Sequence, residues 1–390
     1  MQFLTDFLEQ AKADNLYRKT VTYNPISPTC VQLDGQRYLM LASNNYLGLT
    51  HDPAVQQAAI DAIRLYGTGS GGSRLTTGTY LLVDQLEQEL VQFKEAEAAL
   101  VFNTGYMANL GVLGSLAEPK DVIFSDELNH ASIIDGCRLS RAQIAVYRHA
   151  DIQHLHHLLE NTVCQGKRLI VTDGVFSMDG DLAPLREITR LGELYDAIII
   201  VDDAHSTGVI GPGGKGTAAH FGVSDKVQVQ IGTLSKALGA EGGFVAGSKE
   251  LIDYIKNKAR SFIFSTALAP ATIAAALAAL RQLVTRPEMV TRLTDNTQYV
   301  RRLLQAARLP VVDGMTPIIP IIVGAEENAV RLASELKQQG IIITAIRPPT
   351  VPAGTSRLRL TVSAAHERDE LAWAVDIITT AMRQPGTRVR

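Results

Sequence analysis

A lone lysine stands in the stretch GTLSKALG, where Lys236 is flanked mostly by small side chains. A lysine amine can form a Schiff base with a carbonyl compound, and a bulky carbonyl cofactor needs small neighbours beside that amine. An ordinary loop lysine more often has polar or charged company. The composition around Lys236 therefore indicates a lysine that carries a large cofactor.

Chemically useful side chains also follow other apolar runs that are typical of strands. After residues 98–102 comes the sequence NTGY, which opens a helix whose N–H groups suit a phosphate. The residues of interest that follow the five runs are, in chain order, Gly105, Tyr106, His130, Asp173, Ser177, Asp202, His205, Thr233 and Lys236. In a parallel sheet the carboxyl ends of the strands meet at one rim, so these side chains are predicted to converge.

The combination matches the needs of pyridoxal phosphate, which are a lysine for a Schiff base, an acid that keeps the pyridine nitrogen protonated, and a phosphate cradle. Asp202 suits the acid because a neighbouring carboxylate raises the pKa of a pyridinium. Taken alone, His130 is typical of a hydrogen-bonded loop histidine, and Asp202 is typical of a loop cap. Their convergence on one rim is what favours a site.

The elements that must position these residues alternate between strand and helix. This alternation indicates an α/β fold, with a mostly parallel sheet covered by helices on both faces. A continuously apolar run such as residues 197–201 fits a strand that is buried on both sides. Strands are predicted at 98–102, 121–124, 168–173, 197–203 and 227–233, and helices at 82–94, 107–116, 152–160 and 184–195.

The pattern changes after about residue 283 and predicts a smaller α+β domain. We therefore divide the chain into an N-terminal helix and extension (1–45), a large cofactor-binding domain (46–283) and a C-terminal small domain (284–390). The first 15 residues are expected to form an amphipathic helix. In the C-terminal domain, helices are expected at 285–306, 326–339 and 366–382, and strands at 317–324, 340–346 and 356–363.

Two glycine-rich segments offer a rival function. Residues 67–72 (GTGSGG) and 211–216 (GPGGKG) both satisfy G-x-G-x-x-G, the fingerprint of dinucleotide binding and hence of a nicotinamide-dependent oxidoreductase. That motif requires a strand before it and a helix after it. Gly67 instead follows a helical pattern and Gly211 lies in a loop, so we interpret both segments as loops. The histidines of 149–160 are interpreted as a solvated helix face, because no carboxylate or cysteine stands at metal-ligand spacing beside them.

Composition limits the class of protein. The 390 residues are 46% hydrophobic and 20% charged, which fits a soluble globular protein with a sizeable core. A net charge of −3 argues against a nucleic-acid partner, and no apolar run is long enough to predict a membrane span. Three scattered cysteines predict free thiols in a reducing cytoplasm, with no metal site. The N-terminus lacks the layout of a secretory signal.

The chain resembles the α-oxoamine synthases, a family of fold-type I pyridoxal-phosphate enzymes. The likeness runs from SNNYLGL (43–49) to SRLRLT (356–361). Between them GTGSGGSRLTTGT, HASI, VFSMDGD, VDDAHSTGVIG and GTLSKALG occur in the family's order. Within the family, residues 345–361 are most similar to the 8-amino-7-oxononanoate synthases of biotin biosynthesis.

The resemblance implies a role for each matching residue at the cofactor. Lys236 would form the Schiff base, and Asp202 would pair with the pyridine nitrogen. His205 would contact the ring hydroxyl, and His130 would stack on the ring. Further cofactor-binding residues implied by the family are Gly105, Tyr106, Thr233 and Ser177.

The resemblance also implies substrate contacts and a homodimer. Asn44 would hydrogen-bond near the substrate, and Arg359 would bind the amino-acid carboxylate, for which a bidentate guanidinium is well suited. Arg347 and Arg18 are further substrate-binding candidates. In this family the site lies at a dimer interface, and Ser265 and Thr266 would reach the partner's phosphate.

The implied reaction joins L-alanine to a pimeloyl thioester, carried by CoA or a carrier protein, and gives 8-amino-7-oxononanoate, the free thiol and carbon dioxide. Lys236 would remove the α-proton, and His130 is hypothesised to act as an acid near the acyl carbonyl. Glycine C-acetyltransferase, which uses glycine and acetyl-CoA, is the alternative within the family. Leu75 suits a longer apolar acyl chain but would also tolerate acetyl.

Overall fold

The computed structural model describes residues 1–13 and 16–384 and divides into two compact units. The larger unit is Asn44–Thr294, and the smaller unit combines Met1–Ser43 with Asp295–Arg390. The boundary between them falls within helix α12 (Glu288–Ala306). The N-terminal helix expected over residues 1–15 is α1 (Gln2–Ala13), which buries none of its residues, and residues 14 and 15 lie outside the described part.

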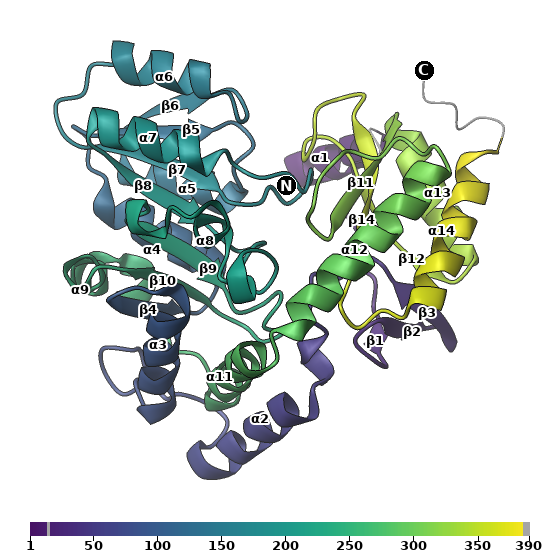
Figure 1. Cartoon of the computed structure of the whole chain (residues 1–390), viewed down its shortest axis with the longest axis horizontal. Coiled ribbons are helices and arrows are strands. Elements are labelled where there is room, and N and C mark those ends of the chain that lie inside the picture. Colours follow the sequence, from purple (N-terminus) through teal and green to yellow (C-terminus); the bar gives the residue numbers. More distant parts are fainter. Residues whose placement is uncertain (14–15, 385–390) are drawn as a thin grey trace. The chain divides into compact units, whose positions relative to one another are not determined.

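A seven-stranded sheet forms the centre of the larger unit (Figure 1). Its strand order is β4-β10-β9-β8-β7-β5-β6. All neighbouring pairs are parallel except those made by β10, which runs antiparallel to both β4 and β9. The strands are β4 (Ala98–Phe102), β5 (Val122–Asp126), β6 (Gln143–Tyr147), β7 (Arg168–Asp173), β8 (Ala197–Asp202), β9 (Val229–Thr233) and β10 (Gly243–Gly247).

Ten α-helices of the larger unit precede α12 in the chain. They are α2 (Pro53–Tyr66), α3 (Leu81–Lys94), α4 (Gly105–Leu116), α5 (Ala131–Ser140), α6 (Ile152–Asn161), α7 (Leu185–Tyr195), α8 (Thr217–Phe221), α9 (Lys249–Lys258), α10 (Arg260–Ile263) and α11 (Pro270–Thr285). Three short 3₁₀ helices, η1 (Leu49–His51), η2 (Pro212–Gly214) and η3 (Ser224–Lys226), complete the set.

Alternate residues of the strands pack into two separate hydrophobic cores, one on each face of the sheet. On β8, Ile200 packs into the core that contains residues of α4, α5 and α9. Its neighbours Ile199 and Val201 pack into the core that contains residues of α6 and α7. Because successive side chains of a strand point to opposite faces, an unbroken apolar run is what a doubly covered strand requires. The predicted α/β class, with a mostly parallel sheet between helices, is confirmed.

Parallel strands in register bring their carboxyl ends to one edge of the sheet. Asp173 at the end of β7 is the register partner of Asp202 at the end of β8, and Ile200 pairs with Val229 of β9. The residues that follow β4, β5, β7, β8 and β9 therefore gather at this edge, which we call the strand-end rim.

Antiparallel β10 was not anticipated from the sequence. It enters between β4 and β9 and begins at Gly243, where a Cβ atom would stand 2.5 Å from the carbonyl oxygen of Thr104. Only glycine allows the strand to pass so close to the loop before α4. The strand therefore borders the rim without adding a side chain to it there.

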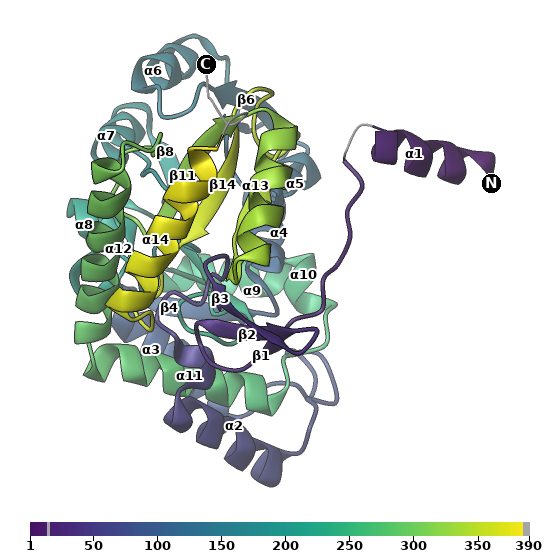
Figure 2. The ribbon, with the colours of Figure 1, turned by 90° about the vertical axis from the view of Figure 1, so that its right-hand side faces the viewer.

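The smaller unit contains two small sheets and three packed helices (Figure 2). Its antiparallel sheet has the order β11-β14-β13, and Leu304, Leu332 and Ile378 from the three helices share a core with Leu358. The second sheet has the order β1-β2-β3-β12, so residues from both ends of the chain pair with one another. The elements are β1 (Asn24–Pro25), β2 (Cys30–Leu33), β3 (Gln36–Met40), β11 (Ile318–Gly324), β12 (Ile341–Ile342), β13 (Thr344–Ile346), β14 (Ser356–Thr361), α13 (Glu326–Gln338) and α14 (Arg368–Met382).

Both glycine-rich segments occur in the predicted context. Gly67 follows helix α2 directly, and Gly211 precedes η2 within the connection between β8 and α8. Neither segment therefore has the strand–turn–helix context of a dinucleotide fingerprint. The three cysteines are free, as predicted. In the described part of the chain, no helix combines the length and the apolar character that crossing a membrane requires.

Candidate active site

Lys236 follows the last residue of β9, Thr233, by three positions and is partly exposed. The turn before it is held by hydrogen bonds, since the Thr233 hydroxyl donates to the Gly242 carbonyl at 2.8 Å and lies 2.7 Å from the Ser235 hydroxyl. The N–H of Gly239 donates to the Lys236 carbonyl at 3.0 Å and closes the turn on the other side. A rigid turn thus carries the lysine at the rim.

Asp202 ends β8 and is a buried acid, only 4% exposed. Its Oδ2 accepts a hydrogen bond from Asn109 Nδ2 at 2.6 Å, and its Oδ1 accepts one from the N–H of Ala204 at 2.9 Å. Two donors leave lone pairs on both oxygens, because a carboxylate can accept about four hydrogen bonds. The site therefore offers a fixed acceptor to a cationic N–H group.

Asp173, the register partner of Asp202, is buried as well. Its pKa lies well above the ordinary value, first because it is removed from solvent and second because Asp202 stands beside it. A raised pKa favours the neutral form of an acid, so burial and the neighbouring Asp202 both favour a protonated Asp173.

His130 lies directly before α5 and caps it: the N–H of Ser132 donates to the His130 Nδ1 at 3.2 Å. The backbone N–H of His130 donates to Asp173 Oδ2 at 2.7 Å, which ties the loop after β5 to the end of β7. The pKa of His130 is lowered by desolvation and by Lys236, against the attraction of Asp202. The charges of Lys236 and Asp202 therefore both act at His130, so these three rim residues lie near one another.

His205 is buried and is held by a residue that the sequence reasoning did not single out. Tyr46, which is fully buried, places its hydroxyl 2.6 Å from His205 Nδ1 and 3.3 Å from Asn44 Oδ1. The predicted substrate-side residue Asn44 is thus linked to the predicted cofactor-side residue His205 through Tyr46. Tyr46 stands within the motif SNNYLGL, so the signal that could have found it was already in the sequence.

The start of α4 is the segment predicted to hold a phosphate, and we call it the cradle. Thr104 caps the helix by accepting the Met107 N–H at 3.0 Å, and Gly105 lies beside Thr233, where an added Cβ would stand 3.4 Å from the Thr233 Cβ. The first N–H groups of a helix have no partner within it and favour an anion. Tyr106 is exposed, and its hydroxyl donates to Asp135.

Ser265 and Thr266 lie beside this cradle within the same chain. The side-chain amide of Asn103 donates to the Ser265 hydroxyl at 3.2 Å and to the Thr266 carbonyl at 2.6 Å. Asn103 immediately precedes the capping residue Thr104, so the segment that the family resemblance assigns to a partner's phosphate is anchored next to the chain's own cradle. Its contribution to a partner remains a prediction.

The loop with Ser177 is fastened by His149, whose interpretation as part of a solvated helix face was wrong. Helix α6 begins only at Ile152, and the His149 ring bridges two carboxylates, with Nδ1 3.0 Å from Asp126 and Nε2 2.7 Å from Asp181. Burial lowers the pKa of His149, but the two hydrogen-bonded carboxylates outweigh it and raise that pKa to about 10. The helical period of residues 152–161 was extended too far back in the interpretation. Asp151 caps the start of α6, so His149 lies before the helix.

A buried ion pair anchors the segment that follows Asp202. Lys94 Nζ lies 3.0 Å from Asp203 Oδ2, and both side chains are almost fully buried. The other oxygen of Asp203 accepts hydrogen bonds from Ser206 and Thr217. Nothing in the sequence marked Lys94 as the partner of Asp203, since 109 positions separate them.

The three predicted substrate-binding arginines belong to the smaller unit. Arg359 is buried on β14, where its Nη1 donates to the Thr361 hydroxyl at 3.1 Å. Arg347 is partly exposed just after β13, and Arg18 is exposed in the N-terminal segment. Their role toward a substrate stays a prediction.

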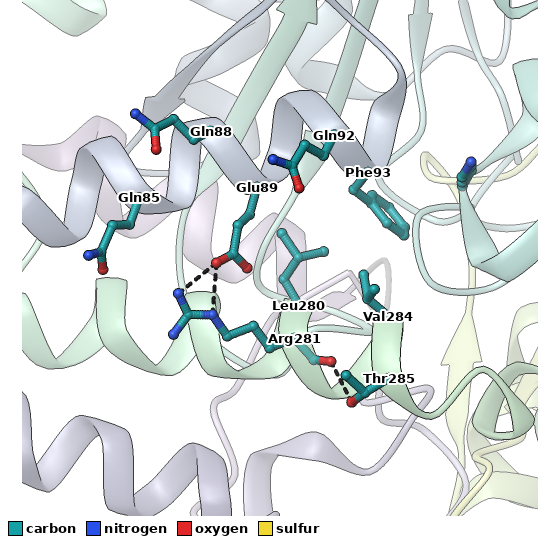
Figure 3. Close-up of a pocket in the computed structure, with 10 residues that line it drawn as sticks. Gln85, Gln88, Glu89, Gln92, Phe93, Leu280, Arg281, Val284 and Thr285 are labelled. Carbon is teal, nitrogen blue, oxygen red and sulfur yellow. Dashed lines mark hydrogen bonds and ion pairs between the residues drawn. The ribbon is translucent and has the colours of Figure 1, made fainter.

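One cavity of the larger unit lies between α3 and α11, away from the rim residues (Figure 3). It has a volume of about 560 Å³, and an ion pair between Glu89 and Arg281 at 2.6 Å spans it. Gln85, Gln88 and Gln92 line one side of it, and none of the predicted site residues contributes. Among residues 1–13 and 16–384, no group of three or more metal-ligating side chains stands together.

The rim residues fit pyridoxal phosphate. The donor set consists of one amine on a hydrogen-bonded turn (Lys236), one buried carboxylate with unused lone pairs (Asp202) and one helix start beside Thr233 (Gly105). These groups match the carbonyl, the pyridine nitrogen and the phosphate of the cofactor respectively.

Known proteins resemble this chain over almost its whole length. The family model described as aminotransferase class I and II matches residues 36–378. The chain is 48% identical over 382 residues to an 8-amino-7-oxononanoate synthase of Geobacter metallireducens, which covers 97% of each protein.

Solved structures agree with the fold. A structure of SPT with a PLP internal aldimine aligns with a TM-score of 0.93 at 32% identity, covering 97% of this chain and 96% of the other. A crystal structure of 8-amino-7-oxononanoate synthase from Francisella tularensis aligns with a TM-score of 0.77 at 30% identity, covering 89% and 98%.

Proposed function

This chain belongs to the aminotransferase class I and II family, and we propose that it is a pyridoxal-phosphate-dependent acyltransferase that joins L-alanine to a pimeloyl thioester. The products are 8-amino-7-oxononanoate, the free thiol and carbon dioxide, so the reaction serves biotin biosynthesis. The observation that carries the proposal is the 48% identity, over 97% of the chain, to a relative of that name.

The rim residues supply the groups that such a reaction needs. Pyridoxal phosphate, when bound, draws electrons away from the α-carbon of the amino acid. Asp202 would hold the pyridine nitrogen in its protonated form, and the start of α4 with Thr233 would hold the phosphate. Lys236 would carry the cofactor and would then, as a free amine, remove the α-proton of alanine.

The neighbouring side chains would orient the reactants. His205, fixed by the Tyr46 hydroxyl at 2.6 Å, would contact the ring hydroxyl of the cofactor. His130 would cover one face of the ring, and Arg359 would bind the carboxylate of the amino acid through a bidentate contact. Arg359 is 5% exposed, so a substrate carboxylate bound there would be held away from solvent.

The amino acid and the acyl group distinguish this proposal from others in the family. A serine palmitoyltransferase from Sphingomonas wittichii, whose name points to serine as its amino acid, aligns with a TM-score of 0.92. The lower identity of 32% to SPT, against 48% to the synthase, favours L-alanine. Glycine with acetyl-CoA remains the second pair to test.

We further propose a cytoplasmic homodimer with shared sites. Three free cysteines are typical of a reducing compartment. Ser265 and Thr266 lie beside the cradle of their own chain. In the proposed dimer, the phosphate site of the second copy would lie against these two residues. Size-exclusion chromatography with light scattering tests the dimer, and a stable monomer with full activity would contradict the shared site.

The first experiment mixes the purified protein with L-alanine and pimeloyl-CoA and follows thiol release together with product mass. The expected result is CoA release with a product of the mass of 8-amino-7-oxononanoate. Lys236→Ala should abolish both signals, whereas Lys226→Ala, an exposed lysine paired with Glu193, should not. Covalent fixation of the cofactor to Lys236 by borohydride reports cofactor binding separately.

Two outcomes would change the proposal in different ways. A protein that binds the cofactor at Lys236 but releases thiol only with glycine and acetyl-CoA belongs to the alternative reaction. A protein that binds no pyridoxal phosphate contradicts the proposal as a whole.

A further inference from the structure

The ring of His130 has one nitrogen whose protonation state is fixed by the backbone. The N–H of Ser132 points at His130 Nδ1 at a distance of 3.2 Å. A backbone N–H can only donate, so Nδ1 must offer a lone pair. In a neutral imidazole the single proton then resides on Nε2.

A second donor reaches the same nitrogen from the Ser132 side chain. The Ser132 hydroxyl lies 2.7 Å from His130 Nδ1, and its oxygen also accepts a hydrogen bond from Asn109 Nδ2 at 2.9 Å. Since Asn109 supplies the hydrogen of that bond, the hydroxyl hydrogen of Ser132 is available for Nδ1. The backbone contact requires an unprotonated Nδ1, and the hydroxyl of Ser132 is free to donate its hydrogen to that same lone pair.

The orientation of Asn109 is set in turn by Asp202. Asn109 Nδ2 donates to Asp202 Oδ2 at 2.6 Å, and a flipped amide would bring its oxygen against the carboxylate. The two hydrogens of Nδ2 thus go to Asp202 and Ser132. Asn109 Oδ1 is buried and has no hydrogen-bond partner. The two hydrogen bonds of Nδ2 therefore fix the orientation of this amide.

The charges around His130 favour its neutral form. The residue caps the ten-residue helix α5, whose N-terminus is positive and disfavours an imidazolium. Desolvation and Lys236 lower the pKa of His130, while Asp202 opposes them. Asp173 faces the backbone N–H of His130, and Tyr106 meets the ring edge-on at 6.4 Å.

We propose that Asn109 and Ser132 are positioning residues that transmit the orientation of Asp202 to His130 and lock it as a neutral imidazole with its proton on Nε2. The inference rests on the proposed function for its consequence in the reaction. A neutral imidazole of this kind is too weak an acid to give up its proton, so His130 acts as a hydrogen-bond donor toward developing negative charge. This role replaces the proton-donating one that we hypothesised from the sequence.

Nitrogen NMR of the ¹⁵N-histidine-labelled protein tests the inference directly, because the two tautomers have different ring shifts. The His130 signals are identified by their absence in His130→Gln, and each sample is measured with the cofactor bound and without substrate. The expected result is an unprotonated Nδ1 and a protonated Nε2 near neutral pH. Protonation at Nδ1 in the unaltered protein overturns the proposal.

Two variants test the positioning chain. Ser132→Ala removes the hydroxyl donor and Asn109→Ala removes its anchor, so both should raise the pKa of His130 in an NMR titration. Ser140→Ala is the matched control, since Ser140 is a buried serine of the same helix that bonds only to the backbone in its own turn. An unchanged His130 pKa in both variants contradicts the proposal.

The kinetic consequence is measured separately from the tautomer. Ser132→Ala should lower kcat for thiol release by about tenfold to a hundredfold while KM for the amino acid changes little. If the unaltered protein releases no thiol, the proposed function fails, yet the NMR result still decides whether Asn109 and Ser132 fix the tautomer. The two failures are therefore distinguishable.

Discussion

Asp173 lies directly opposite Asp202 on the neighbouring parallel strands β7 and β8. Two buried carboxylates at one strand end cannot both ionise cheaply, because each disfavours the charge of the other. Burial and the charge of Asp202 raise the pKa of Asp173 well above its ordinary value. The carboxyl group of Asp173 thus favours its neutral form beside Asp202, the residue that we propose faces the ring nitrogen of the cofactor.

The first prediction concerns the pH dependence of stability in Asp173→Asn. A carboxyl group whose folded pKa is raised stabilises the fold below its unfolded pKa of about 4, and this contribution is lost as the pH rises through the folded value. Asparagine is always neutral and keeps an oxygen for the His130 N–H. Between about pH 5 and about pH 8, the free energy of urea unfolding should therefore fall less for the variant than for the unaltered protein. An equal decline in both proteins would refute this.

The second prediction concerns Asp202→Asn. An amide cannot keep the pyridine nitrogen protonated, so thiol release should fall by about a hundredfold or more while the cofactor still binds. Absorbance of the bound cofactor, read beside the activity, separates the loss of chemistry from the loss of binding. Asp225→Asn, in the short helix η3, is the control and should retain activity. Full activity of Asp202→Asn would remove Asp202 from its assigned role.

The strands and the rim were predictable because they leave local traces in the sequence. Unbroken apolar runs such as residues 197–201 indicate doubly covered strands, and the polar residue after each run marks its carboxyl end. Parallel pairing then places Asp173, Asp202 and Lys236 at one edge. The same logic missed β6 at the edge of the sheet and β10, whose Gly243 and Gly247 are typical of a loop although both pack closely against backbone atoms.

The supporting contacts were not predictable because they join distant positions. Asn109 meets Asp202 across 93 positions, and Tyr46 meets His205 across 159. No periodicity or local spacing reports such a pair, since only the packed fold brings its members together. The sequence therefore indicated which groups act at the rim and left open which groups hold them.

The third prediction concerns the buried ion pair of Lys94 and Asp203. Lys94→Met leaves Asp203 as an uncompensated buried charge, which should lower the free energy of unfolding by about 3–5 kcal/mol. Lys258→Ala removes an exposed pair with Glu118 and should cost less than about 1 kcal/mol. Urea unfolding at neutral pH compares the two. If Lys94→Met lowered the free energy of unfolding as little as Lys258→Ala does, the buried pair would contribute little to stability.

The last prediction concerns His149, whose ring joins Asp126 at 3.0 Å to Asp181 at 2.7 Å. The carboxylates raise the pKa of His149 to about 10 against the effect of burial, so its cation stabilises the fold fully below the unfolded pKa of about 6.5. This contribution is lost as the pH rises through about 10. His149→Gln should therefore lower the free energy of unfolding by about 2–3 kcal/mol near pH 6, and the deficit should shrink above pH 10 or so. Urea unfolding across this range checks it, with His157→Gln on α6 as the control. A deficit that is independent of pH would mean that the ring acts through packing rather than through its charge.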